Sequence, residues 1–72
     1  MKKFKIGDII YKKYWNNTVI IKKIIAIGTY NYDMEILHSS EDILFSKLES
    51  NDSNYIDNVY HIMTDELKAQ YL

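Results

Sequence analysis

The chain has 72 residues, a formal net charge of −1, and neither cysteine nor proline. This length suits one domain, because a domain rarely has fewer than about 50 residues. Without cysteine the chain has no disulfide, thiolate metal site or cysteine nucleophile. A single core of this size seldom contributes more than about 3–5 kcal/mol, so aliphatic packing must hold the fold.

Isoleucine, lysine, asparagine and tyrosine supply 34 of the 72 residues, and arginine is absent. The codons for these four residues are rich in A and T, which indicates a low-GC bacterium or a phage or mobile element living in one. The charge is uneven: residues 1–36 sum to +4 and residues 37–72 to −5. Such polarity suits two halves that attract each other, or a basic half that meets an anionic partner.

The amino terminus begins with lysines, but Gly7 and Asp8 follow where a signal peptide would need an apolar stretch. The longest aliphatic run, residues 24–27, is far shorter than the ~20 residues that span a bilayer. We therefore expect a cytoplasmic protein that does not enter a membrane.

Three segments rich in β-branched and aromatic residues predict strands at 8–15, 18–28 and 30–38. Asn16 and Asn17 predict a two-residue hairpin turn between the first two, because asparagine tolerates the left-handed backbone. This turn would place Lys12 opposite Ile21 and Tyr11 opposite Lys22. No lysine would then face another lysine across the hairpin.

The lysine pairs have a structural explanation that involves no partner. Lys22 and Lys23 interrupt a long β-branched segment that would otherwise favour cross-β aggregation, and Lys12 and Lys13 protect their own strand in the same way. Each face of the hairpin would carry lysines among apolar residues. A bent ribbon, as in a small barrel, would let a strand change faces midway.

The segment 30–38 alternates, with Tyr30, Tyr32, Met34 and Ile36 on one side and polar residues on the other, which predicts a half-buried strand. Residues 41–48 fit either a capped helix or a strand, and we favour the strand. The polar composition of residues 50–54 predicts a loop.

Residues 59–63 predict a short last strand. Thr64 predicts the start of a terminal helix, because its hydroxyl can accept a bond from a free amide and two acidic residues follow it. Leu67 and Tyr71 would share one face of this helix. A helix of this length is marginal alone, so it must pack on the barrel or on a partner, or fray.

The segment Phe4-Lys5-Ile6-Gly7-Asp8-Ile9-Ile10 resembles the opening F-K-x-G-D-x-[IV] of small SH3-like barrels, some of them encoded by phages of low-GC bacteria. Residues 55–60 look like the helical turn and closing strand that end such barrels. The resemblance implies a mainly β barrel of about five strands at residues 1–63, followed by a short C-terminal α-helix at 64–72. Such barrels include nucleic-acid binders, peptide binders and inhibitors of host proteins, so the resemblance leaves the function open.

The residues offer little chemistry. His38 and His61 are 23 positions apart and lack the spacing of metal ligands, and the two glycines are isolated, so no loop cradles a phosphate. The adjacent acids Glu41-Asp42 and Asp65-Glu66 suit caps or solvated charge. We expect no catalytic residue, metal or cofactor, and no enzymatic activity.

Two functional hypotheses remain. The candidate binding residues are Tyr11, Lys12, Lys13, Tyr14, Trp15, Lys22, Lys23, Tyr30 and Tyr32, with Leu67 and Tyr71 on an interaction helix. The favoured hypothesis is a protein-interaction module, an accessory or inhibitory protein of a phage or mobile element that binds a host protein. The alternative is weak, nonspecific nucleic-acid binding, which the lack of arginine disfavours. A homodimer, with or without a small ligand between its subunits, is a third arrangement consistent with the sequence.

Overall fold

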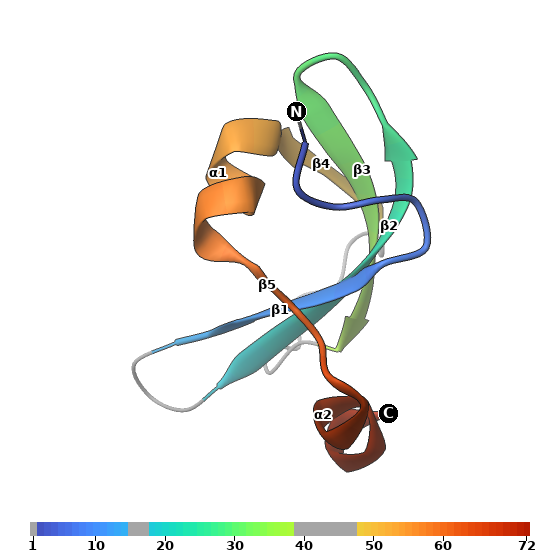
Figure 1. The fold of residues 1–72 in the computed structure, drawn as a ribbon, viewed down its shortest axis with the longest axis vertical. Helices are drawn as coiled ribbons and strands as arrows, with labels where there is room; N and C mark the ends of the chain where they lie inside the picture. The colour runs from blue at the N-terminus through green and yellow to red at the C-terminus, as the bar shows by residue number, and fades with distance from the viewer. Residues whose placement is uncertain (1, 15–17, 39–47) are drawn as a thin grey trace.

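The computed structural model describes residues 2–14, 18–38 and 48–72, and within them five antiparallel strands form one sheet accompanied by two short helices (Figure 1). The predicted fold class, mainly β with about five strands and a short C-terminal helix, is confirmed. The elements in chain order are β1 (Ile9–Lys13), β2 (Val19–Ile27), β3 (Asn31–His38), β4 (Leu48–Asp52), α1 (Ser53–Val59), β5 (His61–Ile62) and α2 (Asp65–Tyr71).

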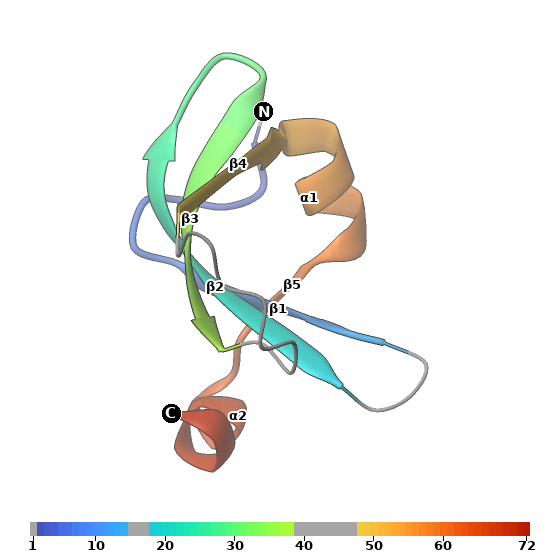
Figure 2. The ribbon, with the colours of Figure 1, turned by 180° about the vertical axis from the view of Figure 1, so that it is seen from behind.

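The strands lie in the order β4-β3-β2-β1-β5. The chain runs from β1 to β4 as neighbouring strands, and α1 then carries it back so that the last strand pairs with the first (Figures 1 and 2). The two edges of the sheet are therefore β4 and β5. No helix in the described part of the chain is long and apolar enough to cross a membrane.

The β1–β2 hairpin has a different register from the predicted one. Lys12 lies opposite Ile20 and Ile10 opposite Lys22, a shift of one residue. The Tyr14 amide donates to the Thr18 carbonyl at 2.9 Å, so three residues, rather than two, lie between the last hydrogen-bonded pair of the hairpin. No lysine faces another lysine in either register, so charge repulsion alone could not distinguish the two pairings.

The expected change of face occurs in β2. Ile21 and Lys22 are consecutive and both buried, although neighbouring strand residues normally point to opposite faces. The pairing of β2 with β3 shifts between these two residues and again around Ile25. These irregularities turn the strand, because an extra residue on one side of a ladder bends it and increases its twist.

Two apolar clusters form the core. The first lies between the sheet and α1 and contains Phe4, Ile10, Ile24, Tyr32, Met34, Ile56 and Tyr60. The second contains Val19, Ile21 and Met63, with Ile9, Tyr11, Leu67 and Tyr71 packed against it. Helix α2 is thus held to the sheet by the face that Leu67 and Tyr71 share. Thr64 caps it as predicted, with its hydroxyl accepting the Leu67 amide.

Three predictions about local structure need correction. Residues 50–54 are not a loop: β4 continues to Asp52, whose carboxylate then caps α1 by accepting the Tyr55 amide. The last strand contains only His61 and Ile62, because α1 extends to Val59. Tyr30 precedes β3 and is 79% exposed, so it does not share the buried face of Tyr32. Of residues 41–48, only Leu48 lies within the described residues, at the start of β4.

The N-terminal segment is tied to β2. Gly7 adopts φ +94°, a conformation that residues with a side chain rarely adopt. Its amide donates to the Ile24 carbonyl at 2.8 Å, and the Ile24 amide donates to the Asp8 carbonyl at 2.9 Å. The Asp8 carboxylate accepts the Lys5 amide at 2.9 Å, which closes a tight turn just before β1.

Candidate binding surface

Helix α1 and the end of β1 bring together two tyrosines and a lysine. The Lys12 ammonium donates a 3.1 Å hydrogen bond to the Tyr55 hydroxyl. It also lies 4.7 Å from the centroid of the Tyr14 ring and 5.6 Å from that of Tyr55. These distances are typical of cation–π contacts. We call Lys12, Tyr14 and Tyr55 the tyrosine–lysine surface.

This surface faces solvent. The Tyr14 and Tyr55 side chains are 36% and 46% exposed. The hydrogen bond to Tyr55 raises the pKa of Lys12 above its ordinary value, so the ammonium stays charged at any physiological pH. The surface therefore presents a fixed positive charge between two exposed aromatic rings before any partner arrives. Tyr55 was not among the predicted binding residues, since the sequence does not indicate that α1 reaches β1.

A buried tyrosine, Tyr60, and a buried lysine, Lys22, pack beneath Tyr55 on the core side of this surface. Tyr60 is buried and contacts the Tyr55 ring edge-on, with centroids 6.4 Å apart and planes at 71°. The Lys22 ammonium lies 5.1 Å from the Tyr60 ring and forms an ion pair with Glu49. Burial lowers the pKa of Lys22, but its bonds to Glu49 and Tyr60 outweigh this effect and raise it overall. Burial raises the pKa of Tyr60, which the Lys22 ammonium partly offsets.

Two predicted binding residues belong to the core instead. Lys22 is 5% exposed and forms an ion pair with Glu49, so its ammonium is not available to a partner. Tyr32 is fully buried; its hydroxyl donates to Asp57 at 2.6 Å and accepts the Phe4 amide at 3.1 Å. Burial, followed by the bond to Asp57, raises the pKa of Tyr32. The sequence showed the alternation in β3, but it did not show that Glu49 would pair with Lys22 or that Asp57 would accept the Tyr32 hydroxyl.

The other predicted residues are distributed over the molecule. Tyr11 is half-buried against the second cluster, with its ring 5.8 Å from that of His61. Lys13, Lys23 and Tyr30 are exposed, and Trp15 lies outside the described residues. The shared face of Leu67 and Tyr71 is covered by the protein's own core, and Tyr71 also contacts His38, with ring centroids 5.7 Å apart. Of the predicted residues that the structure describes, Lys12 and Tyr14 belong to the tyrosine–lysine surface.

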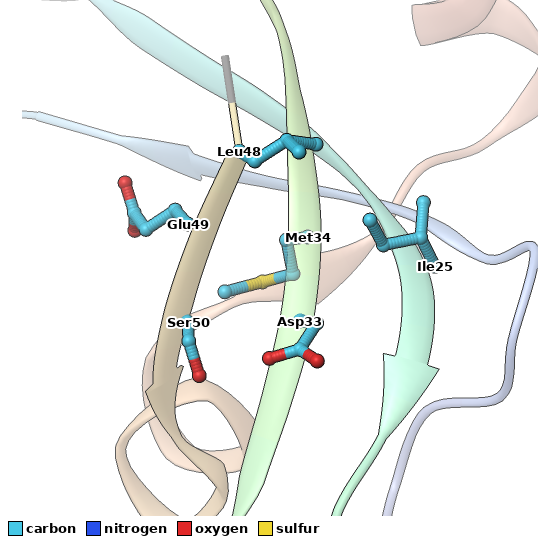
Figure 3. A pocket seen from close by; sticks show the side chains of 6 residues that line it. All are labelled: Ile25, Asp33, Met34, Leu48, Glu49 and Ser50. Carbon is cyan, nitrogen blue, oxygen red and sulfur yellow. The ribbon is translucent and has the colours of Figure 1, made fainter. Parts of the chain in front are cut away.

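A depression of about 320 Å³ lies on β2, β3 and β4 (Figure 3). Its lining residues are Ile25, Asp33, Met34, Leu48, Glu49 and Ser50. Met34 belongs to the first core cluster beside α1, so Asp33, the residue next to it, lies on the opposite face of the sheet, where Ile25 also lines the depression. We call this depression the outer groove.

Among the described residues, no group of three or more histidine, cysteine, aspartate or glutamate side chains could hold a metal ion. The fold and the two surfaces thus define a small, mainly β protein with one cationic aromatic surface and one apolar groove. Comparison with family models, with curated proteins and with solved structures gives no significant match.

Proposed function

We propose that this protein is a small, non-enzymatic interaction module that docks on another protein through the tyrosine–lysine surface. The observation that carries the proposal is the Lys12 ammonium held between the exposed rings of Tyr14 and Tyr55. Tyrosine is a favoured anchor in protein interfaces because it offers a large, partly polar contact area. Here the anchors are already in contact, so little side-chain entropy is lost on binding.

The charge of the surface favours an acidic segment of the partner. The charge comes from Lys12, because Lys13, the next residue in the strand, is exposed but points to the opposite face. The negative charge of Glu49, on β4, is balanced by its ion pair with Lys22. A carboxylate from the partner would meet the Lys12 ammonium while apolar groups beside it contact the two rings.

The source of the partner follows from the coding bias. The abundance of isoleucine, lysine, asparagine and tyrosine fits a phage or mobile element of a low-GC bacterium. We therefore propose a host protein in the bacterial cytoplasm as the partner, with this chain acting as an accessory or inhibitory protein.

The second candidate function is nucleic-acid binding by the same surface, because aromatic rings can stack on bases while lysines neutralise phosphates. The structure leaves few lysines for this role near the rings, since Lys22 is buried and ion-paired and Lys12 alone supplies the charge of the described surface. Any such binding would be weak and would fall steeply with salt.

The two candidates are separated by capture from the lysate of a low-GC bacterium, with nuclease and at rising salt. Tyr55→Ser is the test variant, and Tyr30→Ser is the matched control, because Tyr30 is exposed but outside the surface. We expect a protein that is retained by the wild type and by the control and is lost with Tyr55→Ser, after thermal melts confirm that all three fold. Recovery of nucleic acid alone would reject the favoured function.

A further inference from the structure

We propose that the outer groove binds the N-terminal segment of a second copy of this chain, with Ile6 in the groove and Lys5 beside Asp33. The proposal concerns a different face from the tyrosine–lysine surface and does not depend on the proposed function. It accounts for two exposed apolar features of the described residues.

The first feature is the groove itself. Leu48 on the edge strand β4 is 61% exposed, and Ile25 on β2 is 40% exposed. Ile25 is the extra residue at an irregularity in the β2–β3 ladder, where Ile24 faces Met34 and Ala26 faces Asp33. Such bulges change the direction of a side chain. Figure 3 shows the Leu48 side chain extending from β4 over β3, with Ile25 beyond it on β2 and Asp33 below them. A volume of about 320 Å³ is within the range of pockets that accept small apolar groups.

The second feature is the N-terminal segment just before β1 that contains Lys3, Lys5 and Ile6, which we call the knob. Ile6 is 66% exposed, although it is a large aliphatic residue. Its neighbours are fixed: the Lys5 amide donates to Asp8, and the Gly7 amide donates to the Ile24 carbonyl. The knob is therefore ordered in the free protein, and a partner surface would bury it without first having to order the backbone.

The negative charge of the outer groove favours a positively charged segment as its occupant. Asp33 lines the groove, and Glu35 lies one step away on the same face of β3; neither forms an ion pair with another described residue. The knob carries the opposite net charge, because Lys3 and Lys5 outnumber Asp8, whose carboxylate accepts the Lys5 amide. Two grooves brought face to face would oppose like charges, whereas the knob of one copy and the groove of another are complementary in charge and in apolar character.

The contact between knob and groove can be made twice in a two-fold dimer or repeated head to tail along a chain of copies, and the size of the sedimenting species distinguishes these arrangements. Association should therefore grow with protein concentration. It should also weaken with salt, because the charged residues around the contact are exposed.

Sedimentation velocity over a concentration series, up to about 1 mM, tests the proposal with variants at each side. Ile6→Asp removes the knob and Leu48→Asp fills the groove with charge; both positions are exposed, and circular dichroism checks that the variants fold. We expect each change to weaken self-association about tenfold or more. An equimolar mixture of the two variants should associate again, because one supplies an intact groove and the other an intact knob.

Charge reversal gives a second test. Lys5→Glu and Asp33→Lys should each weaken association, and the double variant should recover most of it. Concentration-dependent shifts of the backbone amides of Ile6, Ile25 and Leu48 in the labelled wild type supply a measurement that needs no variant. A chain that stays monomeric throughout the series, association unaffected by Ile6→Asp, or a mixture that does not associate would each overturn the proposal.

Discussion

The Tyr32 hydroxyl joins two parts of the chain by donating to the Asp57 carboxylate at 2.6 Å and accepting the Phe4 amide at 3.1 Å. Tyr32 lies on β3, Asp57 on α1 and Phe4 in the N-terminal segment. The Lys3 amide also donates to Asp57, at 3.2 Å. One buried hydroxyl thus links the sheet, the helix that covers it and the segment that precedes β1.

Replacing Tyr32 with phenylalanine should lower the free energy of unfolding by about 1–3 kcal/mol, because the buried Phe4 amide and the Asp57 carboxylate lose their partner. Urea denaturation followed by circular dichroism measures the change. Tyr30→Phe is the matched control, since its exposed hydroxyl should contribute nothing measurable. Equal effects at the two positions would show that the hydroxyl of Tyr32 is not structural.

The ion pair between Lys22 and Glu49 should respond unequally to loss of each partner. The Lys22 side chain is 6% exposed, whereas that of Glu49 is 34% exposed and keeps a hydrogen bond from Asn51. Glu49→Ala leaves a buried ammonium and should cost about 1–3 kcal/mol, a value discounted from that of fully buried pairs because Glu49 is partly solvated. Lys22→Met removes the charge that needs compensation, so it should cost less than about 1 kcal/mol.

Chemical denaturation of both variants at pH 7 checks this order. Lys23→Met is the control, because Lys23 is the adjacent exposed lysine in β2. A larger loss with Lys22→Met than with Glu49→Ala would contradict the prediction.

Stability should fall at alkaline pH. The pKa values of Tyr32 and Tyr60 are raised above their ordinary 10.0, mainly by burial, and that of Lys22 is raised above 10.5 by its bonds to Glu49 and Tyr60 despite burial. In each case the folded state holds its proton more tightly than the unfolded state. The stability from these groups is complete below the unfolded pKa and is lost as pH rises through the folded pKa.

Thermal melts from pH 8 to 12 should therefore show a flat region up to about pH 9.5, followed by a decline. Each group that has titrated only in the unfolded state contributes about 1.4 kcal/mol per pH unit to the slope. Tyr32→Phe should make the decline shallower. A melting temperature that is constant up to pH 12 would contradict the prediction.

Helix α2 should depend on its cap and on its contact with the second core cluster. Thr64→Ala removes the hydroxyl that accepts the Leu67 amide and should cost about 1 kcal/mol. Leu67→Ala removes half of the face that packs on this cluster. Both variants should speed amide hydrogen exchange in residues 65–71 and leave β2 and β3 protected.

Gln70→Ala is the control for this helix, since Gln70 is exposed and alanine favours helices. Faster exchange across the whole sheet in the Leu67→Ala variant would show instead that α2 and the sheet unfold as one unit.

Features that depend on neighbouring residues were predictable from the sequence. The alternation of Tyr32 and Met34 with polar residues indicated a half-buried strand, and Thr64 followed by two acids indicated the start of a helix. The locations of β1, β2 and β3 were predicted because β-branched and aromatic residues concentrate there. Each of these signals arises within a few residues of the chain, where periodicity and capping chemistry act.

Features that depend on distant partners required the tertiary structure. The hairpin register is one residue from the predicted one because both pairings keep lysines apart and only the length of the connection distinguishes them. Residues 48–52 form β4 despite their polar composition, because β3 supplies backbone hydrogen bonds along one edge. Composition alone therefore predicted a loop at residues 50–54.

The candidate surfaces show the same division. The sequence by itself determined that lysines and tyrosines would be interleaved in the first strands and that the two halves would carry opposite charge. Only the tertiary structure decided that Lys22 is buried while Lys23 is exposed, because the β2–β3 irregularity and the ion pair with Glu49, 27 positions away, set their environments. It also decided that Tyr55 joins Lys12 and Tyr14, since that contact exists only once α1 has returned the chain to β1.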